Sequence, residues 1–131
     1  MSRSIWKGFF VDLNLVKKFD EVLAQALEEF RITNNYKDLN DTIIKANRLT
    51  IISIARRLSY EEPIEIWTRR STVLPEFIGF CFSIYNGKSF HVVKVNSNML
   101  FHKFGEFVFT KRLGTKIHFS KKGKETVKKK R

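Results

Sequence analysis

The first clear pattern of hydrophobic and polar positions begins at residue 13. Apolar side chains recur there at three- and four-residue spacing: Leu15, Val16, Phe19, Val22, Leu23, Ala26, Leu27 and Phe30. This spacing places them on one face of a helix, and the side chain of Asp12 can cap its start. We therefore predict an amphipathic helix over residues 13–30. The Asn- and Asp-rich residues 31–41 are typical of a turn.

A second apolar pattern follows and is ambiguous by itself. Ile51, Ala55 and Leu58 fit one face of a helix, whereas the many β-branched side chains would also suit a strand. We predict a helix over roughly residues 41–59, which ends before Pro63 because a proline disfavours helical geometry in the residue before it.

From residue 64 the apolar period changes to two. "IEIWT" (64–68) alternates, and "FCFSIY" (80–85) and "SFHVVKV" (89–95) read as strands on either side of Asn86-Gly87. Asn-Gly tolerates the positive φ angles of a type I′ turn, so this is the clearest hairpin signal in the chain. The pattern predicts an antiparallel sheet packed with helices, which is an α+β fold.

The charge of the chain is uneven. The 131 residues suit a single domain, and the formal net charge is +12. Residues 61–109 carry 5 basic and 5 acidic side chains, whereas residues 110–131 carry 10 and 1. We expect a folded domain over residues 1–112 and a basic tail over residues 113–131 that becomes ordered on RNA or DNA; a solvated charged face is the alternative.

The sequence gives little support to an enzyme, a metalloprotein or a membrane protein. No apolar run approaches the roughly 20 residues that span a bilayer. Cys81 is the only cysteine, and spacings typical of zinc ligands, phosphate-binding loops or nucleophile elbows are absent. His102 and Glu106 are four residues apart, but Gly105 disfavours the helix that would bring them together. We expect no catalytic residue, metal or cofactor, and interpret His102 and Glu106 as structural or RNA-facing.

Basic and aromatic side chains interleave in the second half of the chain. Arg69 and Arg70 are adjacent in an extended segment, so at least one guanidinium should face solvent and be able to bind a phosphate. Ser71 adds a small donor. The other basic side chains of this half that we single out are Lys88, Lys103, Lys111 and Arg112. The aromatic residues near basic ones are Trp6, Trp67, Phe101, Phe104 and Phe107. Such rings can stack on bases, and burial in the core is the alternative.

Four strings, taken in order, resemble one protein family. They are "SRSIWKGFFVD" (2–12), "IWTRRSTVLPEFIG" (66–79), "IYNGKSFHVV" (84–93) and "HKFGEFVFTKR" (102–112). Together they are similar to the small-subunit ribosomal protein S-nineteen family. The resemblance implies a small α+β fold with a three-stranded antiparallel sheet. It also implies a structural protein that binds small-subunit ribosomal RNA in the head near the decoding region. Ribosomal protein S-thirteen would be its neighbour, and the tail would point toward transfer RNA.

The resemblance also implies which side chains face RNA. Matching motif positions are Lys7, Arg69, Arg70, Ser71, Lys88, His102 and Lys103. Basic residues of the N-terminal lead, the first helix and the tail complete the set: Arg3, Lys17, Lys18, Lys111, Arg112, Lys116, Lys121, Lys122, Lys124, Lys128, Lys129, Lys130 and Arg131.

The chain departs from the family pattern at two places. The family usually has a short linker where this chain carries an insertion at about residues 31–63. It also commonly has a glycine where this chain has Phe101. If that glycine supplied a positive φ, phenylalanine would be strained there, so we expect the local backbone to differ.

Two further expectations concern location and function. The forms "IWKG" (5–8) and "IYNGK" (84–88) are more similar to mitochondrial members than to bacterial ones. We therefore expect a mitochondrial ribosome, with another organellar or a bacterial ribosome as the alternative. The alternative function is a free nucleic-acid-binding regulator, and an enzyme comes third.

Overall fold

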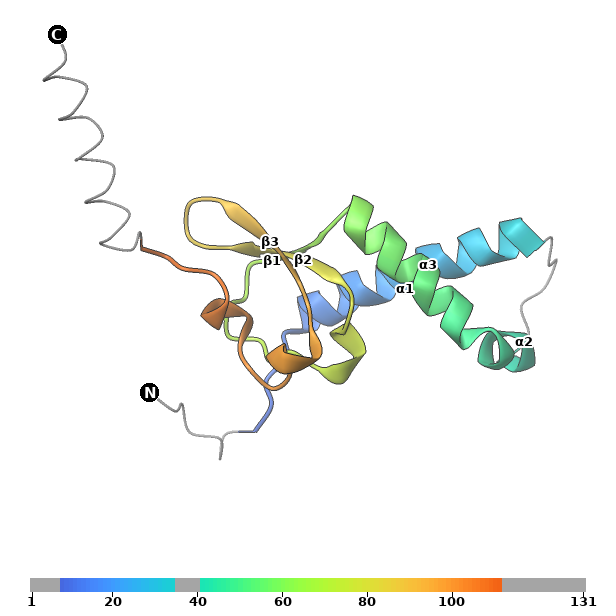
Figure 1. Cartoon of the computed structure of the whole chain (residues 1–131), viewed down its shortest axis with the longest axis horizontal. Helices are drawn as coiled ribbons and strands as arrows, with labels where there is room; N and C mark the ends of the chain where they lie inside the picture. Colours follow the sequence, from blue (N-terminus) through green and yellow to red (C-terminus); the bar gives the residue numbers. More distant parts are fainter. Residues whose placement is uncertain (1–7, 35–40, 112–131) are drawn as a thin grey trace, which may run out of the picture.

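The computed structural model describes residues 8–34 and 41–111 of the chain. Within these residues the α-helices come first and the strands follow (Figure 1). The elements are α1 (Leu13–Asn34), α2 (Asp41–Ala46), α3 (Arg48–Glu61), β1 (Ile64–Ile66), η2 (Pro75–Phe77), β2 (Cys81–Tyr85), β3 (Phe90–Lys94), η3 (Ser97–Met99) and η4 (Phe104–Glu106), where η marks a 3-10 helix. None of the helices described here combines the length and apolar character that a membrane span requires. The predicted tail, residues 113–131, lies outside the described residues.

Helix α1 begins where the sequence predicts. Asp12 Oδ1 accepts a hydrogen bond from the backbone N–H of Asn14 at 2.9 Å, which confirms the predicted cap. The helix continues past residue 30 to Asn34, and the side chains of Thr33 and Asn34 donate to carbonyl groups one turn earlier. Its buried residues confirm most of the predicted apolar face: Leu15, Phe19, Ala26 and Phe30. Val16, which was predicted on the same face, is exposed.

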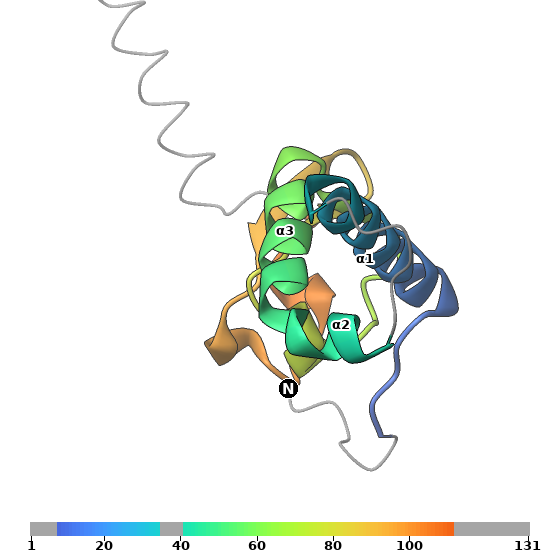
Figure 2. The same cartoon turned by 90° about the vertical axis from the view of Figure 1, so that its right-hand side faces the viewer.

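The second predicted helix is present but is divided at Asn47. The side-chain amide of Asn47 donates to the carbonyl of Ile43 at 3.0 Å, and its backbone leaves helical geometry at φ −104° and ψ 19°. This local bond separates α2 from α3, which then continues to Glu61. Helices α1 and α3 pack side by side (Figure 2). Buried Ser59 joins α3 to the sheet, because its hydroxyl accepts a hydrogen bond from the backbone N–H of Cys81 at 3.3 Å.

The three-stranded sheet is mixed, and the prediction of a fully antiparallel sheet was wrong. The strand order is β1-β2-β3. β1 runs parallel to β2, with Ile64 opposite Phe82, whereas β2 and β3 are antiparallel. Parallel neighbours require a crossover, and residues 67–80 supply it by passing through η2 before the chain enters β2. The alternation in "IEIWT" identified β1 as a strand but could not give its direction.

The predicted hairpin between β2 and β3 is confirmed, with a different turn. Asn86 N–H donates to the carbonyl of Ser89 at 3.0 Å, so Gly87 and Lys88 are the central residues. Gly87 has a φ of 101°, whereas neither Asn86 nor Lys88 has a positive φ, so the turn is not the expected type I′. The Asn86 side chain accepts hydrogen bonds from the backbone of Lys88 and Ser89, both at 2.9 Å, and so closes the turn.

Aromatic rings from distant parts of the chain form the core. The ring of Phe19 in α1 lies 5.0 Å from that of Phe77 and 4.9 Å from that of Phe80. On the other side, Phe82 in β2 lies 5.1 Å from Phe104, which is fully buried. Phe104 therefore anchors the segment "HKFGEF" to the core, so burial and not base stacking accounts for this ring.

Candidate nucleic-acid interface

Three segments that are far apart in the sequence meet beside the sheet. Thr72 N–H donates to the carbonyl of Phe10 at 2.8 Å, and Val73 N–H donates to the carbonyl of His102 at 2.9 Å. Thr72 and Lys103 also form an isolated antiparallel bridge. We call this assembly, residues 8–12, 68–73 and 101–108, the motif layer. It brings together parts of three of the four family-like strings.

Arg69 points inward and fastens the motif layer. Its Nη2 donates to the carbonyl oxygens of Gly105 and Val108 at 2.7 and 2.6 Å, while its Nη1 is buried without a partner among the described residues. Gly105 N–H donates back to the Arg69 carbonyl at 2.8 Å. A Cβ added to Gly105 would lie 3.0 Å from both the Cβ atom and the carbonyl oxygen of Arg69. Glycine at this position therefore permits the close approach of the two segments.

Ser71, another expected RNA contact, is also used inside the domain. Its side chain is fully buried, and its hydroxyl accepts a hydrogen bond from the backbone N–H of Asp12 at 3.2 Å. It also lies 3.2 Å from the hydroxyl of Thr68. These bonds connect residues 68–73 to the start of α1. The hydroxyl of Ser71 is therefore not presented at the surface of the motif layer.

Arg70 points outward, as expected for at least one of the two arginines. It is exposed, and its guanidinium carbon lies 4.3 Å from the centroid of the Phe10 ring. A cation–π contact of this kind orients the planar group and leaves N–H donors at its edge free to bind other groups. Arg70 thus presents a positioned positive charge at the surface.

The opening residues of "HKFGEF" are exposed or half-buried at the same layer. Lys103 Nζ donates to the hydroxyl of Thr72. This bond uses one of the three N–H donors of the Lys103 ammonium group. His102 Nδ1 lies 2.8 Å from Glu106 Oε2. The prediction that Gly105 keeps His102 and Glu106 apart was wrong, because Gly105 lies within η4 and this short helix brings them together. The described residues contain no group of three side chains able to hold a metal ion.

The other predicted RNA-binding residues are dispersed. Lys17 is exposed on α1, Lys88 at the β2–β3 turn and Lys111 at the end of the described segment. Lys18 donates to the carbonyl of Glu65 at 3.2 Å and lies 3.8 Å from its carboxylate. The remaining predicted residues lie outside the described ranges: Arg3, Lys7, Arg112, Lys116, Lys121, Lys122, Lys124, Lys128, Lys129, Lys130 and Arg131.

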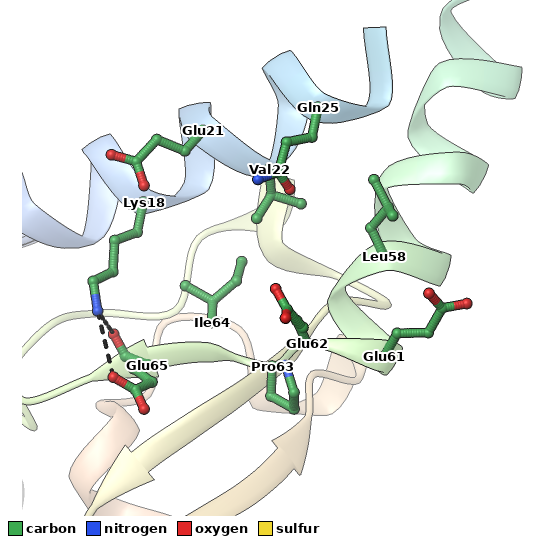
Figure 3. A pocket seen from close by; sticks show the side chains of 10 residues that line it. All are labelled: Lys18, Glu21, Val22, Gln25, Leu58, Glu61, Glu62, Pro63, Ile64 and Glu65. Atoms are coloured by element: carbon green, nitrogen blue, oxygen red, sulfur yellow. Dashed lines mark hydrogen bonds and ion pairs between the residues drawn. The ribbon is translucent and has the colours of Figure 1, made fainter. Parts of the chain in front are cut away.

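A pocket of about 520 Å³ lies between α1, the end of α3 and β1 (Figure 3). Four glutamates line it: Glu21, Glu61, Glu62 and Glu65. Lys18 reaches across to Glu65 at one edge. Carboxylates repel phosphates, so this pocket opposes contact with an RNA backbone. The surface charge therefore favours the motif layer over the pocket as a nucleic-acid interface.

Two exposed rings in segment 8–12 of the motif layer were not identified from the sequence. The side chains of Phe9 and Phe10 are 65% and 39% exposed. The Phe9 ring lies 5.2 Å from that of Phe101. Their position in the sequence could have indicated this exposure. Phe9 and Phe10 precede the Asp12 cap, so the helical pattern that explains burial in α1 does not include them.

A second exposed aromatic group lies on the sheet. Trp67 is 60% exposed, and its ring lies 4.5 Å from that of Tyr85 and 5.0 Å from that of Phe90. The sequence singled out Trp67 as a ring near basic residues, but did not indicate that β2 and β3 would supply its neighbours. Of the aromatic residues singled out in the described part, Trp67 and Phe101 are exposed, whereas Phe107 packs half-buried against the core.

Comparisons with known proteins agree with the resemblance. The family model described as "Ribosomal protein S19" matches residues 41–116, a span that includes part of the expected insertion. The relatives found include three named "Small ribosomal subunit protein uS19". Those of Mesorhizobium japonicum and Allorhizobium ampelinum are 38% and 37% identical, each over 85% of this chain and 85% of the relative. That of Pelagibacter ubique is 35% identical over 99% of this chain and 100% of the relative. All three are bacterial, and a mitochondrial affiliation is not shown. The chain belongs to the ribosomal protein S19 family, and is a structural constituent of the small ribosomal subunit.

Proposed function

We propose that the motif layer is the part of the folded domain that binds small-subunit ribosomal RNA. The observation that supports this proposal is that the residues of the motif layer have two different roles. Arg69, Ser71 and Gly105 hold three distant segments together, whereas Arg70, His102 and Lys103 present cationic or polar groups at its surface. Phosphate contacts of this kind set the position and orientation of a protein on RNA without reading its sequence.

The basic tail extends this interface in the proposal. Residues 110–131 carry 10 basic side chains and 1 acidic one, a density of charge that phosphates would neutralise. By the family resemblance, we place the protein in the head of the subunit, near the decoding region. Ribosomal protein S-thirteen is the proposed neighbour, and the tail is directed toward transfer RNA. The insertion at about 31–63 would contact either an organelle-specific protein or an expanded or reduced RNA element of this ribosome.

The ribosome in question is proposed to be mitochondrial, with a bacterial or other organellar ribosome as the alternative. Support comes from the forms "IWKG" and "IYNGK" alone. Fractionation of source cells would test this. Co-purification with small subunits from isolated mitochondria is the expected result, and recovery with small subunits from another compartment would overturn the location without affecting the RNA-binding proposal.

Sedimentation of ribosomal particles tests the RNA-binding proposal. The full-length chain should co-sediment with the small subunit. Arg70→Glu should release it at lower salt than the wild type because it places a negative charge opposite phosphate. Lys94→Glu, which changes the net charge equally at an exposed position of β3, serves as the control. Equal release of the two variants would contradict an interface at the motif layer. A chain found only on free RNA would favour the regulator hypothesis.

A further inference from the structure

Phe101 has a backbone conformation that phenylalanine rarely adopts. Its φ is 63°, and it is the one residue other than glycine with a positive φ in the part of the chain that the structure describes. Phe101 therefore has the positive φ at which phenylalanine is expected to be strained. Hydrogen bonds on both sides hold the conformation: Phe101 N–H donates to the Val73 carbonyl at 3.0 Å, and Val73 N–H donates to the His102 carbonyl at 2.9 Å. A left-handed conformation at a residue with a side chain is strained.

Burial does not account for phenylalanine at this position. The Phe101 side chain is 57% exposed, and its ring partner, Phe9, is 65% exposed. The two rings lie 5.2 Å apart with 41° between their planes, so each leaves much of its surface in solvent. A strained backbone that displays an exposed aromatic pair is better explained by a partner than by folding.

The charges around this pair indicate the kind of partner. Arg70 lies against Phe10, the neighbour of Phe9 in the sequence, and Lys103 follows two residues after Phe101. Glu106, the acidic residue on η4, pairs with His102. Exposed rings and cations in the same motif layer are suited to a nucleobase on the ring and phosphates on the cations. An apolar protein surface would offer no negative groups to pair with these positive charges.

We propose that Phe9 and Phe101 form a stacking platform for an unpaired nucleobase of small-subunit ribosomal RNA, while Arg70 and Lys103 bind the flanking phosphates. This inference rests on the proposed function and makes it specific. It assigns the strained Phe101 a role that glycine at the same position could not perform, since glycine has no ring.

Site-directed photocrosslinking tests the partner. p-Benzoylphenylalanine is placed at position 101 of the full-length chain. As a control it is placed at Val92, an apolar position on β3 that is 63% exposed, slightly more than Phe101. In purified small subunits, the adduct from position 101 should be ribosomal RNA that nuclease removes, and the control should give much less. An adduct with a neighbouring protein alone, or no adduct at position 101, would overturn the platform. If the chain does not sediment with the subunit, the proposed function itself fails.

The variant Phe101→Gly separates stacking from folding. Glycine adopts a positive φ readily, so the denaturant midpoint of the isolated chain should stay the same or rise. Binding to small subunits stripped of this protein should become about tenfold weaker, which corresponds to about 1.4 kcal/mol, within the range for one base stacked on an aromatic ring. Phe9→Ala should weaken binding in the same way. Unchanged affinity in both variants would refute the inference.

Discussion

Arg69 and Arg70 are adjacent in the sequence, yet their guanidinium groups serve different parts of the molecule. Arg69 donates to the carbonyl oxygens of Gly105 and Val108, which lie far along the chain. Arg70 lies on the ring of Phe10 and faces solvent. Both residues lie in a turn closed by the hydrogen bond from Ser71 N–H to the Thr68 carbonyl, and not in the extended segment that the sequence suggested. From this turn the Arg69 side chain enters the domain and the Arg70 side chain faces solvent. Adjacent positions should therefore give different mutant phenotypes.

Alanine substitution of each arginine tests this difference. Arg69→Ala removes two charge-assisted hydrogen bonds and should lower the free energy of unfolding by about 2 kcal/mol. Arg70→Ala removes one exposed cation–π contact, so its unfolding free energy should change by less than about 1 kcal/mol. Its binding to small subunits should weaken most at low salt, and the salt dependence of binding should become shallower, because one phosphate contact is lost. Denaturant unfolding and salt-dependent sedimentation provide the two measurements. Equal stability losses would contradict the inward and outward assignment.

Gly105 is a second residue whose role depends on a tertiary contact, in this case its close approach to Arg69. Gly105→Ala would place a Cβ atom 3.0 Å from the backbone oxygen of Arg69, so the two segments of the motif layer would have to separate slightly. We expect a loss of about 1–3 kcal/mol in unfolding free energy, measured with denaturant. Glu76→Ala, at an exposed position in η2, provides a control that should be nearly neutral. A stable Gly105→Ala variant would show that the layer is less tightly packed than described.

The helices show where local chemistry defines an element and where it does not. Asp12 caps α1 through a bond to a residue two positions away, so the sequence alone located this end. The additional turn to Asn34 and the break at Asn47 depend on side chains that bond to their own backbone. Asparagine can make such bonds either within a helix or at its boundary, and the apolar spacing does not distinguish the two outcomes.

Asp12→Ala provides a test at the scale of this element. Loss of the capping oxygen should destabilise α1, with a decrease of about 1 kcal/mol in unfolding free energy. Asp20→Ala, at an exposed position inside α1, removes a carboxylate without removing the cap, and should be closer to neutral. Thermal unfolding followed by circular dichroism would compare the two. A larger effect at Asp20 would place the helix start elsewhere.

For the whole molecule, the separation between a nearly neutral body and a basic C-terminal end is the dominant electrostatic feature. Residues 61–109 balance their charges, whereas residues 110–131 do not. Folding of the body does not require the tail in our interpretation, because the core consists of residues between Leu15 and Val108. Association with RNA should require it, because each phosphate contact releases counterions and makes binding sensitive to salt.

Removal of residues 114–131 tests this separation. The truncated chain loses eight basic side chains and one acidic one, so its affinity for small subunits and the salt dependence of that affinity should both fall. Its denaturant midpoint should remain close to that of the full chain. The measurement is the slope of affinity against salt concentration, compared between the truncated and the full-length chain. A truncated chain that no longer folds would contradict the boundary near residue 112.

The sequence by itself determined the features that depend on residues close together in the chain. These were the cap and apolar face of α1, the hairpin at residues 86–89, the uneven charge, and the strings that place the chain in its family. The tertiary structure alone decided the parallel direction of β1, the inward course of Arg69, the pairing of His102 with Glu106, and the positive φ of Phe101. The physical reason is that residues 8–12, 68–73 and 101–108 hydrogen-bond to one another only when the chain is folded. Side-chain directions in the motif layer follow from those contacts and not from local spacing.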